Sequence, residues 1–435
     1  MYRTLLLLAL LAGCVSADTE ARWDALTADV DAVAAPDPAA PVPPELETEA
    51  RLDLLLATAR ARNPALRAAL QRARAALERV GEAAAWEDVV LKFTIDDGMI
   101  RQPFALDRAG MLMVGLMQMI PALGEIDART AAAVHEGRAA LEEYFTAERD
   151  LARDVRRAYA KYYQSARIHS VHARHDAILQ DFEGTADARY RAGAVAQTDV
   201  LKAQIELQRL RREIVENDRD ALVAAARLNQ LMHRSADAPL GPPPAGEPSP
   251  ETGALAAMLE EALAQRPEMR GAVAAIEAAR AQSELAGVRA TVPSFTPEAM
   301  YGFVNGDDDR YDAQVGLNLP WLNPGRSARE RAAGRTLASS EDAQLALADW
   351  IAYEVRAAHA ESEAASRIAA INGDEILDRA RRAVEITRTG YEAGTVEFLD
   401  LLDAERSYRD AELEYYRAVA RHLEAAAELE RAVGR

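Results

Sequence analysis

Two groups of side chains in this sequence could bind a transition metal. Four methionines alternate with other residues along one segment, so they would lie on one face of a β-strand: Met111, Met113, Met117 and Met119. A thioether is a soft ligand that suits Cu(I). Methionine also fills irregular apolar space, and we expect these four side chains to pack rather than to bind a metal.

Three histidines form the second group. His169, His172 and His175 recur every three residues, so adjacent pairs share one face of a helix. Imidazole binds transition metals, but no acidic partner is placed to complete a convincing site. We therefore predict no metal site. A packed or solvated helix face is the expected role, and a transient metal contact is the alternative.

Motifs that carry catalysis are missing from the sequence. It has no glycine-rich phosphate loop, no His-Glu-x-x-His and no Gly-x-Ser-x-Gly. We predict that the protein is not an enzyme and needs no cofactor.

The N-terminal segment predicts a lipid anchor. An apolar run, Leu5 to Leu11, is too short to span a bilayer as a helix and is typical of a signal peptide. Small residues then precede the only cysteine, Cys14, as in a bacterial lipobox. We predict a signal peptide over 1–13, a covalent lipid on Cys14 and an extended, proline-rich leader over 14–44. Val15 after the cysteine favours transfer to the outer membrane of a Gram-negative bacterium.

Charge and hydropathy exclude two classes of function. The formal net charge of −19 argues against nucleic-acid binding, because little would neutralise the phosphates. The sequence has no run of 18 or more apolar residues, so we predict no transmembrane helix. A chain of this kind that crosses a membrane must do so with strands.

A phrase near the middle of the chain returns 201 residues later. Tyr190-Arg-Ala-Gly193 leads into Thr198-Asp-Val-Leu, and Tyr391-Glu-Ala-Gly394 leads into Leu399-Asp-Leu-Leu. The period is far longer than the roughly 20–50 residues of solenoid repeats, so it indicates a duplicated half. We predict a first repeat over 45–234, a proline-rich linker over 235–250 and a second repeat over 251–435.

Both repeats predict the same order of elements. Each begins with a helix interrupted by proline, over 46–87 and 251–291. A β-hairpin follows, over 88–121 and 292–323, with strands at 89–95, 111–120, 298–304 and 311–319. A proline-free helix of roughly 70 residues and a closing helix complete each repeat, over 122–190 and 196–233, then 326–391 and 397–433.

Four strands cannot close into a barrel by themselves. An open sheet edge in lipid leaves backbone groups unpaired, at several kcal/mol each. The strands must therefore stay in water or close by oligomerising. Three chains would supply twelve strands, which is an allowed barrel size.

These features together resemble the TolC-type outer-membrane efflux proteins. The shared motifs are the doubled Tyr-x-x-Gly phrase, the proline near the start of each repeat, the lipobox and the segments that end each hairpin. Those segments, Gly115 to Gly124 and Val315 to Trp321, are most similar to the metal-cation efflux branch. The resemblance covers nearly all of the chain after Cys14.

The resemblance implies a mainly α fold and a homotrimer. Twelve strands would form a small β-barrel in outer-membrane lipid, and long antiparallel helical hairpins would form an α-barrel through the periplasm. The hairpin tips would dock on a periplasmic adaptor protein and, through it, on an inner-membrane pump of the RND type. The tip residues that would contact the adaptor are Tyr190, Gly193, Gly394 and Thr395.

The resemblance also implies a pore gate at the second tip. Asp400 and Asp403 match the acidic rings that constrict a closed pore, and three copies would gather six carboxylates that favour cations. A link from Tyr391 to Asp199 would hold the gate closed. Val396 replaces a basic residue that often joins this lock. The alternative for both aspartates is a solvated helix face.

We therefore predict the channel subunit of a tripartite efflux system, located in the outer membrane and extending into the periplasm, with metal cations as the favoured cargo. The alternatives are a drug-efflux or type I secretion channel of the same fold, or a non-conducting, coiled-coil structural lipoprotein. If 88–121 and 292–323 held no hairpins, the channel prediction would fail.

Overall fold

A computed structural model describes residues 15–96, 111–246, 253–304 and 309–435. The lipidation site predicted at Cys14 and both hairpin turns lie outside the described residues. The chain forms two compact units, and each combines segments of both sequence repeats. The first unit comprises 1–34, 69–144 and 267–347, and the second comprises 35–68, 145–266 and 348–435. The two repeats are therefore not two separate globular domains.

The first unit contains one antiparallel sheet of four strands in the order β1-β2-β3-β4. The strands are β1 (Val90–Asp96), β2 (Met111–Met117), β3 (Phe295–Val304) and β4 (Arg310–Leu317). β1 pairs with β2 and β3 pairs with β4, as predicted. The sequence did not predict that β2 also pairs with β3, which joins the two repeats in one sheet.

Methionines of β2 and β3 lie beside glycines of the neighbouring strand. Met113 lies opposite Gly302 in the register, and Gly115 lies opposite Met300. A Cβ atom added to Gly302 would lie 2.8 Å from the sulfur of Met111. Met111 and Met113 thus occupy space that Gly302 leaves free, which is the packing role expected for these two side chains. Met119 lies beyond the end of β2 and is 39% exposed, so its expected packing role stays a prediction.

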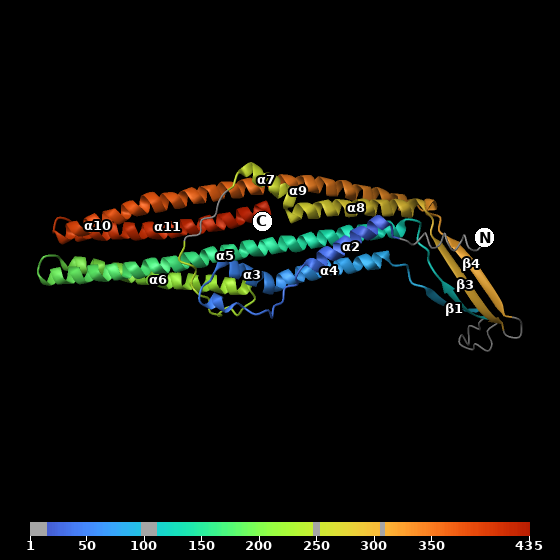
Figure 1. Cartoon of the computed structure of the whole chain (residues 1–435), viewed down its shortest axis with the longest axis horizontal. Coiled ribbons are helices and arrows are strands. Elements are labelled where there is room, and N and C mark those ends of the chain that lie inside the picture. The colour runs from blue at the N-terminus through green and yellow to red at the C-terminus, as the bar shows by residue number, and fades with distance from the viewer. Residues whose placement is uncertain (1–14, 97–110, 247–252, 305–308) are drawn as a thin grey trace. The chain divides into compact units, whose positions relative to one another are not determined.

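Helices lead into the sheet from one end in the first unit. α4 (Pro64–Ala84) leads into β1, and α8 (Pro267–Thr291) leads into β3 (Figure 1).

The leader differs from the extended segment that we predicted, because Ala17–Ala32 forms the helix α2. Ser16 caps this helix, and its side chain accepts a hydrogen bond from the backbone amide of Thr19 at 3.3 Å.

The predicted proline breaks are confirmed in both repeats. α3 (Leu52–Arg62) ends two residues before Pro64, and α7 (Leu255–Gln265) ends two residues before Pro267. Asn63 caps the helix that follows it, because its Oδ1 accepts hydrogen bonds from the amides of Ala65 and Leu66 at 2.9 and 3.1 Å.

The second unit is built on two antiparallel helical hairpins (Figure 1). α5 (Glu125–Arg191) and α6 (Gln197–Leu231) form the first, and α10 (Asp378–Glu392) and α11 (Phe398–Val433) form the second. The long helix predicted over 326–391 has a π-helical interruption, η4 (Ile371–Leu377), between α9 (Pro324–Ala370) and α10. A Cβ on Gly373 would lie 2.7 Å from the Tyr415 ring, so this wider turn sits where α11 approaches closely.

Residues 235–246 of the proline-rich linker are packed against other segments of the second unit. The amide of Gly241 donates a hydrogen bond to the carbonyl of Leu46, in the 3₁₀ helix η1 (Pro44–Glu47), at 2.8 Å. Tyr162 of α5 donates its hydroxyl to the carbonyl of Gly241 at 2.9 Å. These contacts hold residues 235–246 in a defined position, and we call this segment the strap.

Among the described residues, no helix is both long enough and apolar enough to span a membrane.

Candidate functional site

The doubled phrase forms the turns of the two helical hairpins. Gly193 and Gly394 have positive φ angles, 72° and 76°, which residues with a side chain rarely adopt. At the first tip, the amide of Gly193 donates to Tyr190 O and that of Ala194 donates to Arg189 O. At the second tip, the amide of Gly394 donates to Tyr391 O and that of Thr395 donates to Gly390 O. Both are Schellman motifs, so the glycines are explained by helix termination.

The next helix of each hairpin begins at equivalent positions. Ala196 precedes α6 and Glu397 precedes α11, and neither makes a side-chain capping bond. The threonine of the second tip does not cap α11, because the Thr395 hydroxyl donates to Gly390 O at 3.0 Å and so helps to close α10. Asp199 and Asp400 lie in the first turns of their helices, where the helix dipole stabilises an acidic side chain.

The two tips differ in charge one turn further along. Lys202 of the first tip lies 4.0 Å from Asp199, whereas Asp403 takes the equivalent position in the second tip. The carboxylate of Asp403 is 63% exposed and lies 3.3 Å from the Arg406 guanidinium. Asp400 is also exposed. At these two equivalent positions the second tip therefore has two aspartates, one of them paired with Arg406, while the first tip has an aspartate and a lysine.

Tyr391 and Tyr190 have opposite environments despite their equivalent sequence positions. Tyr190 is 42% exposed, and Tyr391 is 3% exposed. The Tyr391 ring lies 5.6 Å from the Phe398 ring, and the Arg189 guanidinium lies over it at 4.2 Å. Its hydroxyl has no hydrogen-bond partner among the described residues. The predicted link from Tyr391 to Asp199 is therefore not formed within the described part of one chain.

Val396, at the position where the resemblance implies a basic residue, packs at the second tip. A Cβ on Gly390 would lie 2.5 Å from a Val396 methyl group. The glycine lets the valine side chain approach the end of α10, so Val396 has a packing role in the turn.

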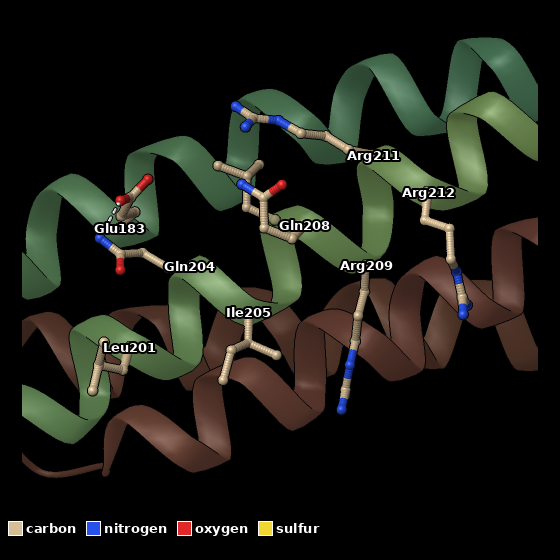
Figure 2. A pocket seen from close by; sticks show the side chains of 9 residues that line it. Glu183, Leu201, Gln204, Ile205, Gln208, Arg209, Arg211 and Arg212 are labelled. Carbon is tan, nitrogen blue, oxygen red and sulfur yellow. Dashed lines mark hydrogen bonds between the residues drawn. The ribbon is translucent and has the colours of Figure 1, made fainter.

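One apolar core joins both hairpins near their tips. Buried side chains of α5 and α6 pack with side chains of α10 and α11: Leu179, Phe182, Ala186, Ala203, Leu207, Leu210, Tyr391, Phe398, Leu401 and Leu402. Tyr391 thus belongs to the joint between the hairpins. An open hollow of about 700 Å³ lies on the outside of this joint, along the start of α6 (Figure 2).

The hollow combines basic and apolar side chains. Figure 2 shows Gln204 turned toward Glu183, to which it donates a hydrogen bond of 2.9 Å. Leu201 and Ile205 are exposed beside it. Three arginines also line the hollow: Arg209, Arg211 and Arg212. The first hairpin therefore has an exposed face that is partly apolar and positively charged.

Ionisable side chains are buried between the hairpins beyond the apolar core. His175 of α5 is 0% exposed and lies between two carboxylates of α11. Its Nδ1 makes a short contact with Glu405 Oε1, and its Nε2 lies 2.7 Å from Glu412 Oε2. Burial alone would lower the pKa of His175, but the hydrogen bonds and charges of the two glutamates outweigh it and raise the pKa. We call these three residues the His175 cluster.

A second buried pair reinforces the joint. Glu206 of α6 is 2% exposed, and both of its oxygens accept hydrogen bonds from the Arg406 guanidinium of α11. Burial would raise the pKa of Glu206, but the Arg406 guanidinium lowers it below its usual value. The spacing of the histidines pointed to His175 but not to its acidic partners, which lie 230 and 237 residues away in the chain. Charged residues at helical spacing on the apolar face of α11 were the available signal.

The other two histidines do not join this cluster. His169 is exposed, 3.5 Å from Asp218, and His172 is buried with an unpaired Nδ1. Burial, with the nearby Arg409 charge, lowers the pKa of His172 to about 4. Among the described residues, no group of three or more His, Cys, Asp or Glu side chains could hold a metal ion.

These shifts predict opposite pH effects from two histidines of one helix. The raised pKa of His175 contributes stability below about pH 6.5 that is lost as the pH rises through the folded-state value. The lowered pKa of His172 costs stability as the pH falls from 6.5 to 4, by about 3 kcal/mol at most. We expect His175→Gln to flatten the alkaline decline of the unfolding midpoint, and His172→Gln to flatten the acidic one.

Thermal unfolding of the purified protein between pH 4.5 and 9 measures both effects. His169→Gln is the matched control, because this exposed histidine should leave the pH profile unchanged. A His175→Gln profile parallel to that of the wild type above pH 6.5 would contradict the assignment of a charged His175.

The comparisons with known proteins agree with this architecture. The sequence profile of the family described as Outer membrane efflux protein matches residues 55–233 and 258–435, one range in each repeat. No curated protein matches the sequence.

Solved structures match the fold over most of the chain. The open state of the MtrE outer membrane channel of Neisseria gonorrhoeae matches with a TM-score of 0.74 and 19% identity. The match covers 92% of this chain and 97% of the MtrE chain. The outer membrane protein VceC of Vibrio cholerae has a TM-score of 0.74 and 18% identity, with 88% and 96% covered. CusC, which changes conformation as it folds and forms a transmembrane channel, matches with a TM-score of 0.76 and 16% identity. The match covers 88% of this chain and 92% of the CusC chain. At these identities the likeness concerns the fold alone. The profile match covers both repeats, and the chain therefore belongs to the outer membrane efflux protein family.

Proposed function

We propose that three copies of this chain form a channel in the outer membrane that passively exports substrate from the periplasm. The open sheet carries this proposal. β1 and β4 are its edges, and both expose apolar side chains: Val90, Leu91 and Phe93 on β1, and Tyr311, Val315 and Leu317 on β4. An open edge in lipid would leave backbone groups unpaired. Edge pairing between three copies would satisfy them in a closed barrel of twelve strands.

The helical tips are the proposed periplasmic mouth of the channel. A periplasmic adaptor would contact Tyr190, Gly193, Gly394 and Thr395, and the basic and apolar hollow on α6 extends this surface. The adaptor would connect the channel to an inner-membrane pump of the RND type, which supplies the energy. A lipid on Cys14 would add an anchor to the outer membrane.

Metal cations are the proposed cargo, because the second tip presents Asp400 and Asp403 to solvent and the chain has a formal net charge of −19. Asp400 shares its helix position with Asp199 of the first tip, so a first-turn helix acid explains it in part. Asp403 replaces a lysine and carries the stronger argument for a charged pore.

Conductance of the purified protein in planar bilayers tests the proposal. Asp400→Asn/Asp403→Asn should lower the preference for K⁺ over Cl⁻ at least about threefold, because two negative charges per copy leave the mouth. Asp218→Asn/Asp220→Asn is the matched control, since both aspartates are exposed on α6 and the change in charge is the same.

Three outcomes separate the hypotheses. Unchanged ion preference in the Asp400/Asp403 variant would contradict the gate assignment while leaving the channel intact. Absence of conductance in the wild type would favour a structural, non-conducting lipoprotein. A conducting channel that fails to restore growth on copper, zinc or cadmium salts, when supplied to cells lacking their own outer-membrane channel, would favour drug efflux or protein secretion.

A further inference from the structure

A basic hollow lies at the end of the sheet where β3 begins and β4 ends, in the first unit. It has a volume of about 340 Å³, which falls within the range of small-molecule sites, about 300–1,000 Å³. Arg289 of α8 and Arg326 and Arg329 of α9 line it, together with Ser294 and Asn318 at the ends of β3 and β4. In Figure 1, this is where α8 and α9 meet the strands. We call it the basic hollow.

The positive charge of the hollow is local, because the chain as a whole is acidic. The first twelve residues of α9 hold four arginines and one glutamate, in a chain with a net charge of −19. The two acids that line the hollow already have cationic partners. Arg289 Nε donates to Glu125 Oε1 at 2.7 Å, and Arg129 lies 3.4 Å from Glu87.

The remaining arginines are available to a ligand. Arg326 donates one hydrogen bond to the backbone carbonyl of Arg289, and a guanidinium has further donors. Arg329 is exposed and makes no hydrogen bond or ion pair with any residue in the described part of the chain. Ser294 and Asn318 add neutral hydrogen-bonding groups at the same place.

Exposed apolar side chains surround the basic hollow. Trp321 and Leu322 belong to the 3₁₀ helix η3 (Pro320–Leu322), which packs against α8, and they are 61% and 71% exposed. Leu123 and Trp86 are exposed next to the lining residues Ala122 and Glu87. Tryptophan is enriched where a protein crosses the boundary between water and membrane, because its ring is amphipathic.

We propose that the basic hollow binds the phosphodiester head group of an anionic phospholipid, beside the membrane-inserted sheet. This inference rests on the proposed function, since it requires the sheet to lie in a bilayer. The guanidinium fork matches phosphate oxygens. The apolar lining residues Met119, Leu285 and Val292 would contact the glycerol and the start of the acyl chains. A free anion would account for the arginines but not for the exposed Trp321 and Leu322.

Native mass spectrometry of the full-length, detergent-purified protein tests this site. We expect phosphatidylglycerol to be retained in preference to phosphatidylcholine. Arg326→Gln/Arg329→Gln should weaken the apparent affinity for phosphatidylglycerol at least about tenfold, because each arginine near a lipid surface contributes about fivefold. Arg329→Gln alone should give about fivefold, which keeps the test valid if the double variant does not fold. The matched control is Arg379→Gln/Arg382→Gln, two arginines exposed on α10.

Several results would overturn the inference. Equal affinity of wild type and double variant for phosphatidylglycerol would do so, as would equal retention of both lipids by the wild type. Complete displacement of phosphatidylglycerol by millimolar inorganic phosphate would identify a simple anion site instead. Conductance in a phosphatidylcholine bilayer separates the two proposals. If it persists without lipid selectivity, only the lipid site fails. If the wild type does not conduct, the proposed function fails.

Discussion

Replacing His175 by leucine is expected to destabilise the joint between the two hairpins by about 3–5 kcal/mol. The imidazole is the only hydrogen-bond partner of the Glu405 carboxylate among the described residues, and Glu405 is 1% exposed. Its other carboxylate oxygen is already unpaired. Leucine would therefore leave a buried carboxylate without a counter-charge, and such a group costs much more than the lost contact itself.

Glu412 should tolerate the change better than Glu405. The Arg174 guanidinium still donates to Glu412 at 2.7 Å, and the Tyr408 hydroxyl lies 3.3 Å away. Most of the destabilisation should therefore arise at Glu405. The double variant His175→Leu/Glu405→Leu removes both partners and should recover a large part of the lost stability, because buried ion pairs can often be replaced by apolar residues.

Hydrogen–deuterium exchange of the intact protein measures this effect where it arises. Amides of α5 and α11 around the His175 cluster should exchange faster in the single variant, and the double variant should restore part of the protection. His169→Leu serves as the control on the same helix, since this histidine is exposed and should shift stability by no more than about 0.5 kcal/mol. Protection in His175→Leu equal to that of the wild type would show that the cluster does not hold the hairpins together.

Replacing Gly241 by alanine is expected to destabilise the second unit by about 3 kcal/mol. A Cβ at this position would lie 2.3 Å from the carbonyl carbon of Thr48 and 2.4 Å from the amide nitrogen of Glu49. Both are backbone atoms, so no side-chain rotation can relieve the overlap. The strap would have to move away from η1, which would break the hydrogen bond from the Gly241 amide to Leu46 and weaken that from Tyr162.

The same strap provides a matched control. A Cβ on Gly246 would meet nothing within 4 Å, so Gly246→Ala should leave stability unchanged or raise it slightly by restricting the unfolded chain. Thermal unfolding of the two variants, with limited proteolysis of the linker, compares them directly. If both alanine variants melt together with the wild type, the strap is not packed against η1 in solution.

Much of the fold follows from local features of the sequence. Pro64 and Pro267 each separate two helices. Proline lacks an amide donor and disfavours the helical conformation in the residue before it. Alternating apolar residues and turn residues predicted all four strands. The leader helix α2 was missed because the prolines that follow it, from Pro36 onward, suggested an extended segment, while its own five alanines favour a helix.

The candidate site could be predicted only in part. The glycines of both tips follow from the doubled phrase, since each occupies a left-handed position that ends a helix. The difference between Lys202 and Asp403 is also a property of the sequence. The buried position of Tyr391 was not predictable, because its equivalent, Tyr190, occupies the same place in the doubled phrase yet is 42% exposed.

The sequence by itself determined the duplication, the order of helices and strands, the two turns and the acidic second tip. These properties depend on residues a few positions apart, where backbone geometry and side-chain spacing act directly. Only the tertiary structure decided that β2 pairs with β3, that His175 lies between Glu405 and Glu412, and that arginines of α8 and α9 form a basic hollow. Burial and charge pairing depend on distances in space, and these partners come from different repeats or from different helices.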